Sequence, residues 1–528
     1  MEVTGCLLIG AEEGWGAGAG FRAVDPARDQ EIEPEFRCAD DRQIDLACDR
    51  AAGAFDAYRS LPVERRADFL ECIALELERL GESIVARAML ETGLPRPRLA
   101  GELIRTTRQL RLFAQEVLRG CWQDATIDAV EPGAAHAPGV DLRRRNIPVG
   151  PVAVFGASNF PLAFSVAGGD TASAFAAGCP VVVKAHPAHP GTSELAGKAI
   201  RNAVEACQVP AGVFSLVQGN DHVQGERLVK HPAIRAVGFT GSRSGGMALM
   251  RHAAARPVPI PVFAEMSSLN PLFLLPQALR TRAVRIAEDF ADSLTLGCGQ
   301  FCTNPGVVIG IAGDDLEAFL GHASAAIGRK SPATMLTGGI HRLYQEGLAH
   351  LNEQEGVDAI AVGRTGDGPN LGVAHLYRTT GAHFMRAPDL RAELFGPSSL
   401  VVVCASADEM LSIAAMLEGQ LTATLQADPA DHALVMRLLP GLERLAGRVV
   451  LNGFPTGVEV SHAMVHGGPF PATSDGRSTS VGMAAMMRFL RPVCYQNFPD
   501  AWMPEPVRDG NPERIWQTRN GQLMTPMS

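Results

Sequence analysis

The chain has 528 residues and a net charge of −10, from 57 acidic and 47 basic side chains. This length exceeds one ordinary hydrophobic core, so we expect two or three domains. The acidic balance argues against a nucleic-acid-binding surface, and no apolar run is long enough for a membrane span, so neither partner is expected.

The cysteines indicate the compartment. There are 11 of them, scattered without CxxC pairs. An odd count in a long chain disfavours a disulfide framework and favours a reducing environment. The first residues lack the basic stretch of a signal peptide. We therefore expect a cytoplasmic protein.

The N-terminal part of the chain predicts a hairpin followed by helices. The glycine-rich run 14–20 lacks the strand before it and the helix after it that a dinucleotide loop needs. Residues 21–26 indicate a short strand ending in a turn. Residues 41–119 carry apolar side chains at helical spacing, and Gly93-Leu94-Pro95 divides them into helix groups.

The next segment, 124–146, is polar and interrupted by Gly and Pro, so it predicts an excursion from the core. It ends in Arg143-Arg144-Arg145, which we interpret as a solvated basic face.

From Pro148 onward, short apolar runs alternate with helical segments, beginning with a helix predicted over 163–177. Such alternation is typical of a parallel sheet with helices on both faces. The predicted strands are 151–156, 180–184, 213–217 and 236–240, then 307–311 and 400–404 in a second alternating region that spans 272–452. The C-terminal residues, rich in Pro, Asn and Arg, predict an arm.

One thiol and one carboxylate predict covalent catalysis on an aldehyde. Cys302 ends the run Gly299-Gln300-Phe301-Cys302, and Glu265 lies upstream in Phe263-Ala264-Glu265-Met266. A thiolate adds to a carbonyl carbon, a hydride leaves to a cofactor, and a carboxylate activates the water that hydrolyses the thioester.

Polar residues at the ends of predicted strands extend this site, because ligands bind at the carboxyl ends of parallel strands. The amide of Asn159 suits a developing oxyanion, with a plain turn residue as the alternative. Lys184 suits a ribose or phosphate, with a surface lysine as the alternative. Gly241 and Ser242 precede a predicted helix, whose N-terminus can hold a phosphate.

Together these segments resemble the NAD(P)-dependent aldehyde dehydrogenase superfamily, from about Phe21 to Val493. Seven short motifs in the family order are far more specific than any single one. The motifs are Asn159-Phe160-Pro161, Val183-Lys184, Phe239-Thr240-Gly241-Ser242, Glu265-Met266, Gly299-Gln300-Phe301-Cys302, Glu393-Leu394-Phe395-Gly396-Pro397 and Asn452-Gly453.

The resemblance implies roles for the matching residues. Cys302 is similar to the nucleophile, Glu265 to the base for the deacylating water, and Asn159 to the side-chain donor of the oxyanion hole, which the Cys302 backbone amide completes.

On the cofactor side, Lys184 and Glu393 resemble the residues that hold the two riboses. Ser242, with Gly241, resembles a pyrophosphate contact, and Phe395 a residue beside the nicotinamide.

The resemblance also implies an α/β fold, the aldehyde dehydrogenase fold. A Rossmann-like cofactor domain is expected over 1–123 and 147–264, and an α/β catalytic domain over 265–452. A small oligomerisation hairpin and arm are expected over 124–146 and 485–528, so we expect a homodimer or homotetramer.

Departures from the family pattern bear on the cofactor. Pro187 stands where many NAD-preferring members have a Glu, so nothing there repels a 2′-phosphate. Lys184 and His186 can pair with that phosphate. We expect NADP, with NAD possible. Ser158 replaces the usual Trp, and Ser267-Ser268 replace two glycines after the base.

A metal site is not expected. Cys298 and Cys302 form a rival thiol pair, and His186 and His189 form a bare HxxH, but further ligands and the Glu of a zinc motif are lacking.

Local variants narrow the resemblance to the branch that contains α-ketoglutarate semialdehyde (2,5-dioxopentanoate) dehydrogenases and an NADP-dependent long-chain fatty aldehyde dehydrogenase. The variants are 156–159, 184–190 and 300–306. The first substrate needs a cation and the second an apolar tunnel.

Residues 456–477 stand in the place of the family's tunnel loop and contain His462, His466, Phe470 and Arg477. Arg477 suits a carboxylate or is a solvated surface residue, so both substrates remain open.

We weigh two alternative functions against aldehyde oxidation. A CoA-acylating dehydrogenase is disfavoured by the presence of Glu265. A non-catalytic binding protein on this scaffold is disfavoured because Cys302, Glu265 and Asn159 are all retained.

Overall fold

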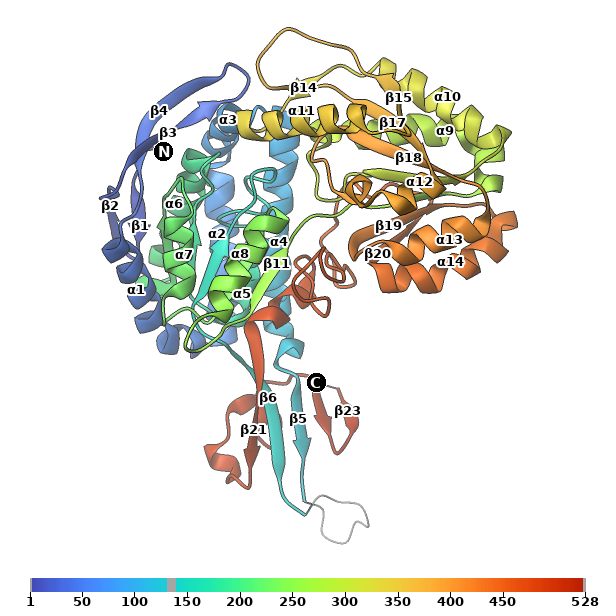
Figure 1. Ribbon diagram of the computed structural model, residues 1–528. Coiled ribbons are helices and arrows are strands. Elements are labelled where there is room, and N and C mark those ends of the chain that lie inside the picture. Colours follow the sequence, from blue (N-terminus) through green and yellow to red (C-terminus); the bar gives the residue numbers. More distant parts are fainter. Residues whose placement is uncertain (1, 131–138, 526–528) are drawn as a thin grey trace.

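The computed structural model describes residues 2–130 and 139–525. Two seven-stranded sheets form the body, and a five-stranded sheet projects from it (Figure 1). No helix within these ranges is both long and apolar enough to cross a membrane.

The first sheet has the order β11-β10-β7-β8-β9-β1-β2. Its first five strands are parallel, and β1 is antiparallel to β9. The strands are β1 (Leu7–Ile9), β2 (Glu12–Gly14), β7 (Val152–Phe155), β8 (Val181–Lys184), β9 (Phe214–Val217), β10 (Ala236–Thr240) and β11 (Val262–Glu265). The alternation predicted here is present, and β7, β8 and β9 are fully buried.

The helical pattern of 41–119 forms four helices, and Gly93 ends the third in a left-handed conformation (φ 67°) that suits glycine. The helices of this half are α1 (Asp41–Arg59), α2 (Val63–Arg79), α3 (Gly81–Thr92), α4 (Arg96–Arg119), α5 (Gly169–Ala177), α6 (Pro190–Ala206), α7 (Val223–Lys230) and α8 (Arg243–Ala254).

The helix predicted over 163–177 begins only at Gly169. The Glu102 carboxylate accepts hydrogen bonds from the backbone of Leu162 and Ala163, both at 2.9 Å. These bonds hold the preceding residues in a turn, so the prediction was wrong for 163–168.

The second sheet has the order β15-β17-β18-β13-β12-β19-β20, parallel except for β15. Its strands are β12 (Leu272–Leu274), β13 (Val307–Ile311), β15 (Val357–Val362), β17 (His375–Thr380), β18 (Ser398–Cys404), β19 (Gln420–Gln426) and β20 (Ala446–Leu451). Its helices are α9 (Pro276–Thr295), α10 (Asp314–Gly328), α11 (Gly338–Glu353), α12 (Gly381–Arg386), α13 (Ala407–Met416) and α14 (His432–Leu445).

Two small ribbons accompany the sheets. One is the hairpin of β3 (Gly20–Asp25) and β4 (Gln30–Arg37), which confirms the strand predicted over 21–26. The other pairs β14 (Ala333–Thr334) with β16 (Leu371–Gly372).

The projecting sheet joins the polar segment 124–146 to the C-terminal residues, in the order β21-β6-β5-β22-β23 (Figure 1). The strands are β5 (Ala125–Asp128), β6 (Leu142–Pro148), β21 (Leu490–Gln496), β22 (Gln517–Arg519) and β23 (Gln522–Met524). Part of the predicted hairpin, residues 131–138, lies outside the described residues.

The basic run on β6 is not wholly a solvated face. Arg143 is only 4% exposed, and its guanidinium forms ion pairs with Asp141, Asp500 and Asp509. Because these carboxylates satisfy its donors, the arginine can be buried. Arg144 is exposed, as expected.

Candidate active site

The predicted catalytic residues meet where the two large sheets face each other. Glu265 is the last residue of β11 and Asn159 lies in the loop after β7, both at carboxyl ends of parallel strands. Cys302 lies in the loop between α9 and β13 of the second half.

The Cys302 loop is fixed by backbone geometry. Gly297, Cys298 and Gly299 have φ values of 56°, 59° and 65°. A Cβ on Gly299 would lie 2.4 Å from the backbone of Gly396 and Pro397. Only glycine permits this approach, so the loop packs directly on the segment that follows Glu393.

Asn270, which the sequence analysis missed, holds the same loop from below. Its Nδ2 donates to the backbone oxygens of Cys302 and Asn304, both at 2.9 Å, and its Oδ1 accepts from Thr422 on β19 at 2.9 Å. The side chain is completely buried, and these bonds tie the nucleophile loop to the second sheet.

Asn159 lies against the Cys302 loop. Its Nδ2 donates to the backbone oxygen of Gln300 at 2.9 Å. A side-chain amide carries two donor hydrogens, so the second remains for an oxyanion formed at Cys302.

His466 joins the thiol and the carboxylate. Its Nε2 lies 2.8 Å from Oε1 of Glu265 and 3.5 Å from Sγ of Cys302. Ser480 donates to the other oxygen of Glu265 at 2.8 Å. Glu265 is 2% exposed and His466 is 0% exposed, so the three groups interact away from bulk water, where electrostatic contacts are strong.

The segment that carries His466 covers the edge of the first sheet. Residue 473 forms an isolated antiparallel bridge with Glu265, and Ser474 exchanges hydrogen bonds with Ala264 on β11. This pairing delivers His466 to the site from 201 positions along the chain. From the sequence, His466 is expected only in the tunnel loop, because no local motif marks a role for it beside Glu265.

The charges of the site favour a neutral thiol and an ionised carboxylate. Burial, and then the charge of Glu265, raise the pKa of Cys302 well above its usual value. Burial by itself raises the pKa of Glu265, but contacts with His466, Ser480 and Cys302 outweigh it and lower that pKa below the usual value. Reaction therefore requires a group that removes the thiol proton.

One carboxylate, one thiol and one imidazole within 4.8 Å of one another also match a metal-ligand spacing. Here Glu265 and His466 use their ligand atoms in a direct 2.8 Å hydrogen bond. The expectation of no metal stays a prediction.

A cavity of about 1030 Å³ opens onto the three predicted catalytic residues, Asn159, Glu265 and Cys302. Its size suits a cofactor with a small substrate. The predicted residues on its lining are Asn159, His186, Gly241, Ser242, Glu265, Cys302, Glu393 and Phe395. The lining continues to Arg22 and Asp29 on the β3–β4 hairpin.

Lys184 is absent from this lining. Its Nζ donates to the backbone oxygen of Gly219 at 2.6 Å, and burial lowers the pKa of Lys184 to about 8. The ammonium lies behind the cavity wall, and a ribose contact requires it to turn.

His186 lies on the wall as a neutral ring. Burial, followed by the neighbouring His189 and Lys184, lowers the pKa of His186 well below its usual value. Its Nδ1 accepts from the backbone N–H of Ala188 at 3.1 Å. The proton of the neutral ring therefore lies on Nε2, which is a donor.

Ser242 is the N-cap of α8 and accepts from the backbone N–H of Gly245 at 3.2 Å. The remaining N–H groups of the first turn suit a phosphate group.

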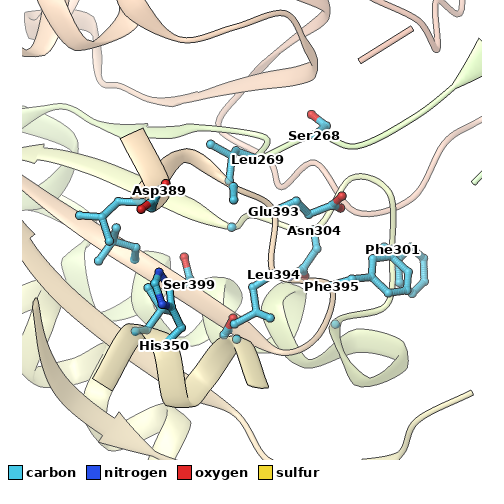
Figure 2. A pocket seen from close by; sticks show the side chains of 18 residues that line it. Ser268, Leu269, Phe301, Asn304, His350, Asp389, Glu393, Leu394, Phe395 and Ser399 are labelled. Atoms are coloured by element: carbon cyan, nitrogen blue, oxygen red, sulfur yellow. The ribbon is translucent and has the colours of Figure 1, made fainter. Parts of the chain in front are cut away.

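Glu393 also lines a second, smaller cavity of about 120 Å³, shown in Figure 2. Burial raises the pKa of Glu393 to about 7, although Ser267 and Ser268 donate to it. Among the described residues, Oδ1 of Asn304 and Oγ of Ser399, both labelled in Figure 2, have no partner. Unpaired polar groups on a cavity lining suit ordered water.

Arg477, considered for a substrate carboxylate, is 91% exposed and pairs with Asp475 at 3.0 Å. It is a surface residue. His462 and Phe470 are also exposed, so of the four residues marked in the loop only His466 reaches Cys302.

Comparison with known proteins agrees with this geometry. Residues 15–489 match the model of the aldehyde dehydrogenase family. The chain is 54% identical to α-ketoglutaric semialdehyde dehydrogenase 2 of Azospirillum brasilense, over 99% of this chain and 100% of that protein. It is 48% identical to α-ketoglutaric semialdehyde dehydrogenase of Acinetobacter baylyi, over 91% of each chain.

Among solved structures, aldehyde dehydrogenase 21 of Physcomitrella patens has the same fold, with a TM-score of 0.78 at 18% identity over 93% of this chain and 97% of that one.

Proposed function

The chain belongs to the aldehyde dehydrogenase family, and from this premise we propose that it oxidises 2,5-dioxopentanoate (α-ketoglutarate semialdehyde) to 2-oxoglutarate. The observation that carries this substrate is the full-length identity of 54% to a relative named for it. Cys302, Glu265 and Asn159 around one cavity supply groups for the chemistry.

In the proposed reaction, the Cys302 thiol first loses its proton. Nε2 of His466 contacts both Sγ of Cys302 and Oε1 of Glu265. In the proposed step Nε2 gives its own proton to the carboxylate, and the lone pair that this frees takes the thiol proton. The thiolate attacks the aldehyde carbon, and the amide of Asn159 with the Cys302 N–H stabilises the oxyanion.

A nicotinamide dinucleotide, when bound in the cavity, supplies the hydride acceptor. Phe395 and Glu393 on the lining would position its nicotinamide end, and Ser242 its pyrophosphate. Glu265 releases the first proton to solvent and then removes a proton from the water that hydrolyses the thioester on Cys302. No metal takes part in this scheme.

We propose NADP as the preferred cofactor, with NAD also accepted. No carboxylate stands at Pro187, and the N–H of His186 Nε2 can donate to a 2′-phosphate. Lys184 with its pKa of about 8 is largely protonated at neutral pH and adds a cation when it turns toward the cavity.

The domain roles belong to the same proposal. Residues 1–123 and 147–264 bind the cofactor, 265–452 carry the nucleophile, and the projecting sheet forms an interface between subunits. Large apolar side chains stand exposed on its C-terminal part, including Trp502 at 75% and Leu523 at 68%. Light scattering should therefore show a dimer or tetramer.

The deciding experiment is the absorbance at 340 nm with NADP and a panel of aldehydes. We expect 2,5-dioxopentanoate to have the highest kcat/KM, above pentanal and a long-chain aldehyde, with no dependence on CoA. A preference for the long-chain aldehyde, or a requirement for CoA, would overturn the proposal.

A further inference from the structure

The proposed substrate brings a carboxylate into a partly buried site, and a buried anion needs a cation with free donors. Arg98 and Arg448 lie near Cys302, but terminal nitrogens of both have partners within the protein, and Arg477 lies further out. Arg98 pairs with Glu102 at 2.5 Å. Both terminal nitrogens of Arg448, on β20, donate to the backbone oxygens of Gly457 and Pro455, and only its buried Nε lacks a partner among the described residues. Arg477 lies on the surface, paired with Asp475.

Arg105, on α4, differs from these three. Its Nε donates to the backbone oxygen of Val458 at 3.2 Å, which fixes the plane of the guanidinium. Its Nη1 has only a long contact of 3.5 Å with Gln109. Its Nη2 is buried and has no partner among the residues that the structure describes. An unpaired buried donor is costly in a native fold unless a ligand satisfies it.

A continuous layer of rings connects Arg105 to the nucleophile. The guanidinium carbon lies 5.1 Å from the ring centre of Phe164, which lies 6.1 Å from the ring of His466. His466 in turn contacts Sγ of Cys302 at 3.5 Å. Burial chiefly lowers the pKa of Arg105, and the negative charges of Glu102 and then of Cys302 act against that shift. Arg105 therefore lies close enough to Cys302 for their charges to interact.

We propose that Arg105 binds the carboxylate of the substrate, through Nη2 together with Nη1, while Cys302 attacks the aldehyde at the other end. This inference rests on the proposed function. In 2,5-dioxopentanoate four carbon–carbon bonds separate the two groups, a span of about 5 Å. Phe164 packs beside the chain between them, and the planar fork of the guanidinium matches a carboxylate in two parallel hydrogen bonds.

The test replaces Arg105 by Met, which keeps an unbranched apolar side chain and removes the guanidinium group. We compare 2,5-dioxopentanoate with pentanal, which has the same five carbons and no carboxylate. For Arg105→Met we expect kcat/KM for the oxo acid to fall by about 30-fold or more, mainly through KM, while pentanal changes by less than about threefold. Arg477→Met is the matched control and should leave both substrates unchanged.

An equal loss on both substrates would overturn the inference, because Arg105 would then act only on the structure. Unchanged kinetics on the oxo acid would overturn it as well. If Arg105→Met does not fold, Arg105→Lys provides the test, because lysine keeps the charge but cannot form two parallel hydrogen bonds to a carboxylate. A KM that rises for the oxo acid and not for pentanal supports bidentate binding by Arg105. An unchanged KM for the oxo acid contradicts it. Failure of the proposed function has a different signature, since the wild-type enzyme itself would then prefer pentanal.

Discussion

The wall that we propose for the cofactor and the wall that we propose for the substrate are built in different ways. On the cofactor side, His186, Gly241 and Ser242 follow parallel strands of the first sheet. On the other side, His466 comes from an irregular segment and Arg105 from the middle of a helix. Residues that follow parallel strands gather at one sheet edge by topology, whereas the second group meets only through tertiary packing.

The largest expected effect concerns Cys302, which lies between the two walls. Cys302→Ala should lower kcat by at least about 1,000-fold, because no other thiol reaches the cavity lining. Cys298→Ala is the matched control: this thiol contacts the backbone oxygens of Ala333 and Gly372, away from Glu265. Steady-state rates at 340 nm measure both variants, and a Cys302→Ala enzyme with normal turnover would refute the mechanism.

The next effect concerns the carboxylate at the end of β11. Glu265→Gln should slow thioester hydrolysis by about 100-fold or more, because the amide cannot take a proton from water. Rapid mixing should then show a burst of reduced cofactor of about one equivalent per site, followed by a slow steady state. A slow rate without a burst would show that the steps before thioester hydrolysis limit this variant, which would contradict the main role proposed for Glu265.

His466 gives a smaller effect with a characteristic pH dependence. His466→Phe should lower kcat at neutral pH by about 10- to 100-fold, because the thiol then lacks its proton acceptor. Since the pKa of Cys302 lies above its usual value, the thiolate fraction is small below that pKa and rises about tenfold per pH unit. The rate of the variant should rise with pH more steeply than that of the wild type. Parallel pH profiles would contradict a proton-transfer role.

The smallest effect lies on the cofactor wall. Pro187→Glu places a carboxylate near His186, which should repel a 2′-phosphate and accept hydrogen bonds from ribose hydroxyls. We expect the ratio of kcat/KM for NADP to that for NAD to fall by about 10-fold. Pro187→Gln is isosteric with this change but uncharged and should shift the ratio less. An unchanged ratio would remove Pro187 from cofactor selection.

The difference between residues placed by strand topology and residues placed by tertiary packing explains how much of the structure the sequence could predict. The buried strand runs and the helices over 41–119 have strong periodicity, and they are present in the structure. Cys302, Glu265 and Asn159 stand in short motifs and share one cavity. The misses depended on distant partners: Glu102 delays the start of α5, and the tail carboxylates bury Arg143.

His466 and Asn270 were missed for the same reason. A lone His or Asn in an irregular segment carries no periodic signal, and its partners lie 201 and 32 positions away. Only the pairing of residues 472–474 with β11, and the packing of the Cys302 loop, define their roles.

Asn270 has a consequence for how the chain can be divided. It anchors the carbonyl of Cys302 to β19, whereas Glu265 ends a strand of the first sheet. Sulfur and carboxylate thus stand beside different sheets, and residues 266–271 connect β11 of the first sheet to β12 of the second. If the gene were split within this connection, each fragment would retain half of the reacting pair, and activity would return only when the fragments reassemble.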